Sequence, residues 1–249
     1  NSGVKVDASL VRKYGSTWRV DVPGLKAGSY TLKIVGVKGG KEGPAAATET
    51  LAVKAYDRSG FAFSNDHVPG AYKMDGTLKD GAVIIYITES TKNSVKLDVT
   101  TDNKGGTTSC TGFQAILTAI KKGFEKRPLD FRLVGNITDP DSTDKGDILV
   151  DMGKKEGMVV TIEGVGPDAT ANGWGIRIKN AQDVEVRNLG IMNVNSGEGD
   201  NIGLQQDNSY VWVHNCDFFY GDAGSDKDQV KGDGALDCKK STYVTFSYN

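Results

Sequence analysis

Four acidic residues fall in two short clusters near the end of the chain. They are Glu198, Asp200, Asp233 and Asp237. Asp200 precedes Val211 by 11 residues, and Asp233 precedes Val244 by 11 residues. In a structure that repeats with this period, both aspartates lie at nearly the same height on neighbouring strands, about 4.8 Å apart at the backbone. The spacing therefore predicts a stack of carboxylates.

Stacked carboxylates repel each other unless a cation lies between them. Calcium accepts several carboxylate oxygens at about 2.3–2.6 Å and tolerates irregular geometry. The four carboxylates come without a histidine or a thiolate, which favours a hard cation over zinc. Asp233, Asp237 and Lys239 are separated by even numbers of residues, so their side chains share one side of an extended strand. Two interpretations stay open, a calcium site and a solvated acidic edge without an ion.

Composition argues against several other kinds of chemistry. The chain has 30 Lys and Arg against 32 Asp and Glu, so we expect no bulk attraction to nucleic acid or to an anionic membrane. It has no run of about 18 apolar residues that could span a bilayer. The two histidines, His67 and His214, are far apart, which makes a Ser-His-Asp or Cys-His enzyme unexpected. Cys110, Cys216 and Cys238 lack zinc or disulfide spacing and are interpreted as buried small side chains.

The elements that would position the carboxylates repeat from residue 129 onward. Five segments share an alternating apolar pattern with a glycine or asparagine at its end: 131–135, 160–164, 184–188, 211–215 and 244–249. Their first residues are 29, 24, 27 and 33 apart. This spacing predicts an all-β fold, a right-handed parallel β-helix in which stacked coils share one core. Asn188 and Asn215 fall at equivalent turns, where asparagine tolerates left-handed dihedrals and can bond to neighbouring coils.

A second strand of each coil precedes the first one, and the acidic clusters surround it. Its segments are 176–178, 202–204 and 236–238. A gap-free alignment pairs the outward Asp237 with the apolar Leu204, so stacking of the carboxylates requires a one-residue difference between turns. Residues 113–124 have helical spacing, with Ser109 or Thr111 as the expected cap. This helix is expected to cover the exposed N-terminal end of the solenoid.

Residues 1–56 are expected to form a small β-sandwich-like module. Its predicted strands are 4–10, 17–22, 30–37 and 50–54. The turn from Leu25 into Tyr30 resembles the tyrosine corner of fibronectin type III domains. That sandwich has about seven strands, so the four predicted strands indicate a partial module. Residues 57–109 are predicted to be a linker and β segment leading into the solenoid, which occupies residues 110–249.

Residues 175–249 resemble the polysaccharide lyase family 1 pectate lyases, which are parallel β-helices. The matching segments are 184–189, 198–202, 211–215, 233–239 and 243–249. Position by position, the resemblance implies that Glu198, Asp200, Asp233 and Asp237 are calcium ligands, and that Lys239 contacts a substrate carboxylate. It also implies a secreted, calcium-dependent enzyme that cleaves polygalacturonate by β-elimination after an arginine takes the C5 proton.

One part of the family pattern is not found. The family's arginine base lies one or two coils further on, in an Arg-x-Pro-x-x-Arg motif, and no arginine follows Arg187 here. We therefore expect a β-helix that is incomplete at its C-terminal end and has little lyase activity alone. It would be a monomer or would associate with a missing C-terminal segment. The alternatives are a non-catalytic polygalacturonate-binding β-helix and a β-helical hydrolase, for which the required acid pairs and signatures are not found.

Two further features favour structural interpretations. The loop 221–228 lengthens one coil and is interpreted as a solvated acidic loop rather than as further calcium ligands or the rim of a groove. Trp174 and Trp212 could stack on sugar rings, but packing is the favoured role for both. Trp212 alternates with the core residues Val211 and Val213, so its side chain is expected to face outward.

Overall fold

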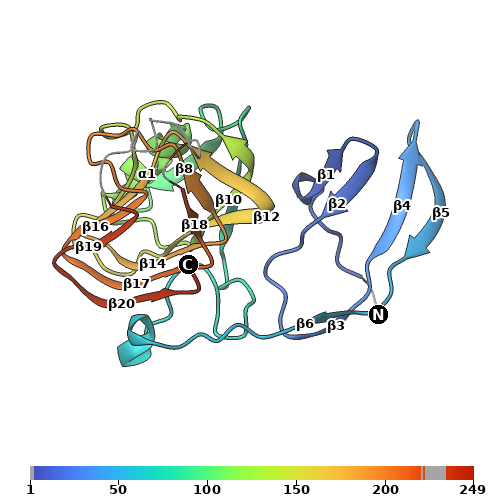
Figure 1. The fold of residues 1–249 in the computed structure, drawn as a ribbon, viewed down its shortest axis with the longest axis horizontal. Helices are drawn as coiled ribbons and strands as arrows, with labels where there is room; N and C mark the ends of the chain where they lie inside the picture. Colours follow the sequence, from blue (N-terminus) through green and yellow to red (C-terminus); the bar gives the residue numbers. More distant parts are fainter. Residues whose placement is uncertain (1–2, 220, 222–233) are drawn as a thin grey trace.

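Two parallel sheets form the solenoid (Figure 1). The structure is a computed structural model that describes residues 3–219, 221 and 234–249. The eight-strand sheet contains β7 (Val83–Ile87), β10 (Leu129–Ile137), β12 (Val160–Asn172), β14 (Gln182–Arg187), β15 (Gly190–Met192), β17 (Asn208–His214), β18 (Asp217–Phe218) and β20 (Ser241–Ser247). The four-strand sheet contains β11 (Ile148–Asp151), β13 (Ile176–Lys179), β16 (Ile202–Gln206) and β19 (Leu236–Cys238). Every neighbouring pair in these sheets is parallel, which confirms the predicted parallel β-helix.

The strand register follows the predicted repeat except at its first step. Val160, Val184, Val211 and Val244 lie side by side on successive strands, as the sequence predicted. Val160 also pairs with Leu129, whereas the repeat had aligned it with Phe131. A shift of two residues leaves every side chain on the same face, so the alternation alone could not separate these two registers. Strand β7 pairs with β10, so the sheet begins within residues 57–109, the range predicted as a linker and β segment.

The inward side chains of both sheets form one continuous core. Ile162, Ile178 and Val186 belong to it and have no exposed surface. Each such side chain contributes about 1.5–3 kcal/mol by leaving water. Asn188 and Asn215 adopt the predicted left-handed conformation, with φ of 50° and 52°. The side-chain amide of Asn188 donates a 2.7 Å hydrogen bond to a carbonyl of the preceding coil, so it links two coils as expected.

The helix α1 (Phe113–Ile120) places its apolar face in the solenoid core. It follows the antiparallel hairpin of β8 (Lys96–Thr100) and β9 (Thr107–Thr111). The helix ends four residues earlier than predicted, and Phe124 is 39% exposed beyond it. Its N-cap is Gly112, so the expected caps Ser109 and Thr111 were wrong and belong to β9 instead. Among the described residues no helix is long enough to cross a membrane.

Residues 3–54 form short hairpins beside the solenoid. The elements are η1 (Ala8–Leu10), β1 (Val11–Tyr14), β2 (Thr17–Val20), β3 (Gly28–Tyr30), β4 (Lys33–Lys38), β5 (Lys41–Ala47) and β6 (Leu51–Val53). The antiparallel pairs are β1 with β2, β3 with β6, and β4 with β5 (Figure 1). The predicted strand 4–10 was wrong, because Asp7 accepts a 2.8 Å hydrogen bond from the Ser9 backbone and begins a 3₁₀ turn. Within residues 3–54 only Leu10 is buried, so these hairpins do not share a core of their own.

The chain then crosses the outer face of the eight-strand sheet. We call residues 56–79 the covering segment, which includes η2 (Phe61–Asp66). The Ala71 backbone N–H donates a 2.8 Å hydrogen bond to the Thr161 hydroxyl, and the Gly70 N–H donates a 3.0 Å bond to the Asp183 carbonyl. Gly70 has a φ of 75°, and a Cβ there would overlap the Thr161 hydroxyl, so this close approach requires glycine.

Candidate metal centre

The outward face of the four-strand sheet carries the predicted site residues. Strands β13, β16 and β19 pair in the register that the sequence predicted. Gly203 pairs with Arg177 on one side and with Asp237 on the other, so these residues form one outward row. Asp237 lies beside Gly203 rather than beside Leu204. The one-residue difference that the calcium interpretation required is therefore present.

Asp200 and Asp237 meet at two glycines. A Cβ at Gly203 would lie 3.0 Å from Asp200 Oδ2, so the carboxylate occupies the space that a side chain would fill. The Gly234 N–H donates a 2.9 Å hydrogen bond to Asp200 Oδ1. A Cβ at Gly234 would overlap Asp237 Oδ1. Both carboxylates thus lie against Gly234, which brings two of the predicted ligands together.

Glu198 has a different environment from the two aspartates. Its Oε1 accepts a 2.7 Å hydrogen bond from Lys145 Nζ and a 3.1 Å bond from Arg177 Nη1. The bond from Lys145 is the main cause that lowers the pKa of Glu198 below its usual value. Both basic groups contact the same oxygen, Oε1, and neither contacts Oε2. Its contacts fit a residue that holds the loop preceding Asp200.

Arg177 joins two loops at this face of the sheet. Its side chain is 5% exposed and forms ion pairs with Asp144 and Glu198. Its Nη2 also donates a 3.1 Å hydrogen bond to the Asp144 carbonyl. Asp147 lies nearby and accepts a 2.9 Å hydrogen bond from the Gly175 N–H, and burial raises the pKa of this carboxyl. The loop before β11 and the loop before β16 are thereby fixed to the same guanidinium.

The remaining predicted residues give a partial picture of the site. Asp233 lies outside the described residues. Lys239 is exposed directly after β19, and its N–H donates a 2.8 Å bond to the Leu204 carbonyl. Within residues 3–219, 221 and 234–249, no group of three or more His, Cys, Asp or Glu side chains is placed to hold a metal. Asp200 and Asp237 both border Gly234, and carboxylate oxygens are the ligands that a hard cation prefers, although such a cation needs more ligands than these two.

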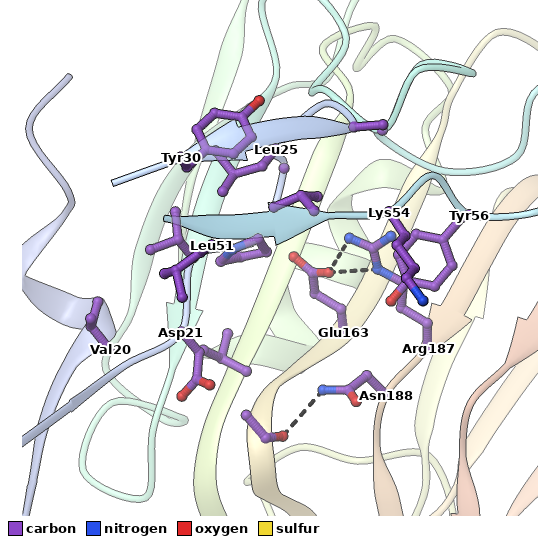
Figure 2. A pocket seen from close by; sticks show the side chains of 18 of the residues that line it. Val20, Asp21, Leu25, Tyr30, Leu51, Lys54, Tyr56, Glu163, Arg187 and Asn188 are labelled. Carbon is purple, nitrogen blue, oxygen red and sulfur yellow. Dashed lines mark hydrogen bonds and ion pairs between the residues drawn. The ribbon is translucent and has the colours of Figure 1, made fainter. Parts of the chain in front are cut away.

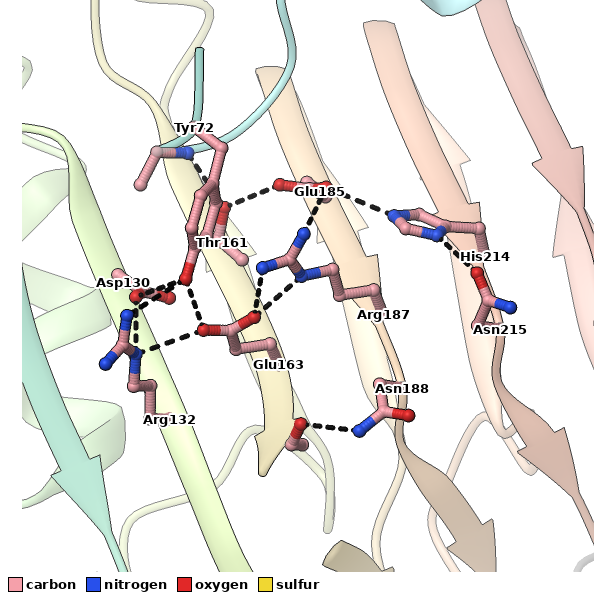
Figure 3. Close-up of polar contacts among 12 residues, drawn as sticks. Tyr72, Asp130, Arg132, Thr161, Glu163, Glu185, Arg187, Asn188, His214 and Asn215 are labelled. Atoms are coloured by element: carbon pink, nitrogen blue, oxygen red, sulfur yellow. Dashed lines mark hydrogen bonds and ion pairs between the residues drawn. The ribbon is translucent and has the colours of Figure 1, made fainter. Parts of the chain in front are cut away.

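A second group of polar and charged residues lies where the covering segment meets the eight-strand sheet (Figure 3). We call it the buried charge cluster, and its members are Arg58, Tyr72, Asp130, Arg132, Glu163, Glu185, Arg187 and His214. Arg132 Nε donates to Asp130 at 2.8 Å and to Glu163 at 3.1 Å. Arg187 Nε donates a 2.6 Å hydrogen bond to the other oxygen of Glu163. Three guanidinium groups thus balance three carboxylates at this face.

Burial and pairing shift the pKa values of this cluster in opposite directions. Burial and the neighbouring Glu163 raise the pKa of Asp130 well above its usual value. Burial would also raise the pKa of Glu185, but Arg187, His214 and Arg58 lower it to about 2. Arg58 approaches Glu185 at 3.6 Å, and burial lowers the pKa of this guanidinium. These residues stabilise one another, which marks the cluster as a structural feature.

A cavity of about 600 Å³ lies between the N-terminal hairpins and the flank of the eight-strand sheet (Figure 2). Its charged lining is largely paired, since Asp21 forms ion pairs with Arg12 and Arg19, and Glu163 pairs with Arg187. None of the described site residues predicted from the sequence lines this cavity. It is separate from the candidate metal centre.

The tryptophans and cysteines mostly follow their predictions. Trp174 is fully buried in the core, and Trp212 faces outward but is 1% exposed because the covering segment packs on it through Phe63. Both therefore have the packing role that was favoured. Cys110 and Cys216 are buried as expected. Cys238 is exposed, contrary to the prediction, because its strand is the last one described in the four-strand sheet.

The fold and the carboxylate pair define a parallel β-helix with a candidate cation site on its outer surface. Residues 141–249 match the family model described as pectate lyase. A pectate trisaccharide-lyase of Bacillus licheniformis is 33% identical over 153 residues, which cover 60% of this chain and 42% of that protein. Pectate lyase A of Aspergillus niger is 38% identical over 96 residues, which cover 37% of this chain and 28% of that protein. The resemblance inferred from the sequence is thus supported for the solenoid.

A solved structure has the same fold. A pectate lyase from Bacillus sp. N165 in complex with trigalacturonate aligns with a TM-score of 0.52 at 22% identity. The alignment covers 76% of this chain and 50% of that one. The present chain spans less than half the length of the curated relatives described above.

Sequence reasoning missed three residues that shape the site. Arg177 was noted only as part of a basic triplet, although its ion pairs fix two loops. Gly203 and Gly234 were not singled out, although each makes room for a carboxylate. The sequence held one signal for Gly203: it is a glycine at an outward strand position, and it lies between Arg177 on one neighbouring strand and Asp237 on the other.

Proposed function

We propose that the solenoid is the substrate-binding and catalytic part of a pectate lyase that cleaves polygalacturonate by β-elimination. The observation that carries the proposal is the convergence of Asp200 and Asp237 at Gly203 and Gly234. This arrangement lies within residues 141–249, which match the pectate lyase family model. Relatives named pectate lyases support the same reaction class.

The proposed cofactor is calcium. Asp200 and Asp237 would hold it, with Asp233, which lies outside the described residues, as a further proposed ligand. Glu198 is a further proposed ligand, and the bonds of its Oε1 to Lys145 and Arg177 would also keep the loop before β16 in place. When bound, the cation would neutralise the acidic residues and attract a uronate carboxylate.

The reaction begins at a proton next to that carboxylate. Removing the C5 proton of a galacturonate unit builds negative charge on the adjacent carboxylate, which a nearby ammonium group stabilises. Lys239 is exposed on the same face as Asp237, two residues further along the chain, and is the proposed contact for this charge. Among the described arginines, Arg177 is held in ion pairs and Arg187 lies on the other sheet, so neither is assigned as the base.

The surroundings of the solenoid suggest two finer proposals. The Tyr30 hydroxyl donates a 2.8 Å hydrogen bond to the Lys26 carbonyl, the bond expected of a tyrosine corner. This contact supports a fibronectin type III-like origin for the N-terminal hairpins. We also propose that the protein acts outside the cell, because its proposed substrate is a large extracellular polymer.

An absorbance assay tests the proposed function. Elimination creates an unsaturated uronate that absorbs near the ultraviolet edge. Assayed together with the further coils in which the arginine base is expected, the solenoid should therefore give rising absorbance with polygalacturonate and calcium, and EDTA should abolish it. Hydrolysis would release reducing ends without this absorbance. Binding of polygalacturonate without either product would favour the non-catalytic alternative.

Matched variants connect the assay to the site. Asp237→Asn should abolish the calcium-dependent signal, whereas Asp217→Asn, an exposed carboxylate on β18, should leave it unchanged. An Asp237→Asn variant that retains full activity would contradict the assigned site.

A further inference from the structure

The outward face of the four-strand sheet, which we call the open face, carries a second lysine near the row of Lys239. Ile178 pairs with Leu204, and Leu204 pairs with Cys238. The next residues, Lys179 and Lys239, therefore lie on the same outward side, apart from a one-residue irregularity in β16. Two strand spacings separate them, which is about 9–10 Å at the backbone.

Lys179 has no ion-pair or hydrogen-bond partner for its ammonium group in the described part of the chain. The carboxylate next to it across the sheet, Asp151, is bound by Lys121 at 2.8 Å. Arg177, which shares the outward side of β13, is held by Asp144 and Glu198. Lys179 is half-buried, so part of its side chain remains accessible to an anion.

The row of the two lysines runs beside the row that contains Asp237. A pyranose unit is about as long as one strand spacing, so a polyuronate lying across β13, β16 and β19 can place a carboxylate at each lysine. We propose that Lys179 binds a carboxylate of the same polyuronate chain, about two sugar units from the carboxylate at Lys239. Lys179 would then determine affinity for longer substrates. The inference rests on the proposed function.

Calorimetric titration with two oligomers tests this role. In the presence of calcium, Lys179→Gln should weaken binding of tetragalacturonate about tenfold, the loss expected for one charge-assisted contact. Digalacturonate cannot reach both lysines, so its affinity should change less than about twofold. Lys179→Arg, which keeps the charge, should retain most of the tetragalacturonate affinity. The control is Lys104→Gln, in the turn between β8 and β9, which should bind both oligomers like the wild type.

The outcomes separate this inference from the proposed function. Three results for Lys179→Gln would overturn the role of Lys179. They are an equal loss of affinity for both oligomers, an unchanged affinity for both, and a changed affinity for calcium. A wild-type protein that binds neither oligomer would overturn this role as well. A wild-type protein that binds tetragalacturonate but yields no unsaturated product, even together with the further coils in which the base is expected, would refute the lyase proposal, while the Lys179 result would still stand.

Discussion

The two outward faces of the solenoid differ in how completely their charged residues are paired. On the eight-strand sheet the covering segment buries the charge cluster, and Arg132 and Arg187 bind Asp130, Glu163 and Glu185. On the four-strand sheet Lys239 and Asp237 are exposed, and neither has an ion pair within the described residues. Figures 1 and 3 show that both faces are built from stacked parallel strands.

This difference teaches where function resides in a repetitive fold. Stacked strands bring side chains of successive coils together, so any charged row needs counter-charges. On the outward face of the eight-strand sheet, which we call the covered face, the protein itself supplies the counter-charges. The same contacts attach residues 56–79 to the sheet. The open face leaves Lys179 and Asp237 without such partners in the described chain, as expected where a cation and an anionic ligand would complete the arrangement.

The largest expected effect comes from breaking the covered face. Arg187→Met should destabilise the protein by about 3–5 kcal/mol, because Glu163 and Glu185 would keep buried charges without their partner. Urea unfolding measures this change, with Lys104→Met as the exposed control. A loss below about 1 kcal/mol would be typical of a surface ion pair and would contradict the contrast between the faces.

Lowering the pH should reduce the free energy of unfolding, because Glu185 on the covered face becomes protonated. Its pKa is lowered to about 2 in the folded protein, so its stabilising effect is complete above the unfolded value near 4.5 and is lost as the pH falls toward 2. The shift corresponds to about 3 kcal/mol. The free energy of unfolding of Glu185→Gln should therefore fall less between pH 5 and pH 3 than that of the wild type. Parallel pH curves for the two proteins would argue against the ionised Glu185.

A substitution on the open face should change calcium affinity rather than the free energy of unfolding. Asp237→Asn should weaken calcium binding by at least about 100-fold, since loss of even outer-shell partners costs 10–100-fold at metal sites. Its urea midpoint should stay close to that of the wild type, because Asp237 is exposed. Calorimetry with calcium checks the affinity, and Asp217→Asn serves as the control. Strong unfolding of Asp237→Asn would assign a structural role to this face as well.

The smallest expected effect is that of Gly203→Ala. The new methyl group would lie 3.0 Å from Asp200 Oδ2, so the carboxylate must move by a few tenths of an ångström. We expect calcium affinity to fall about threefold to tenfold, which is about 0.7–1.4 kcal/mol. Unchanged affinity would show that Gly203 is not needed to position Asp200. Gly36→Ala, where a Cβ meets no atom within 4 Å, is the matched control.

Much of the open face could be predicted from the sequence. The alternation of Ile176, Ile202 and Leu236 set the register of the four-strand sheet, and that register brought Asp237 beside Gly203. The positions of Asp200 and Asp237 beside this sheet also follow from the sequence pattern, whereas their role as calcium ligands stays a prediction. Local pattern was sufficient here because each coil repeats the same strand.

The covered face and the N-terminal region could not be predicted in this way. Glu185 and Arg187 occupy outward positions that read as solvent-exposed, and only the distant covering segment buries them. The bond between Glu198 and Lys145 is likewise a long-range contact, 53 residues apart in the chain, that the strand pattern does not predict. Alternation within one strand carries no information about a segment that arrives from elsewhere in the chain.

The central claim is that Asp200 and Asp237 form a cation site on the open face. Diffraction from crystals soaked in calcium tests it most directly. We expect an anomalous peak beside Gly203 and Gly234, with oxygens of both aspartates about 2.3–2.6 Å away. A peak at another carboxylate group, or no bound ion at a calcium concentration that supports activity, would contradict it.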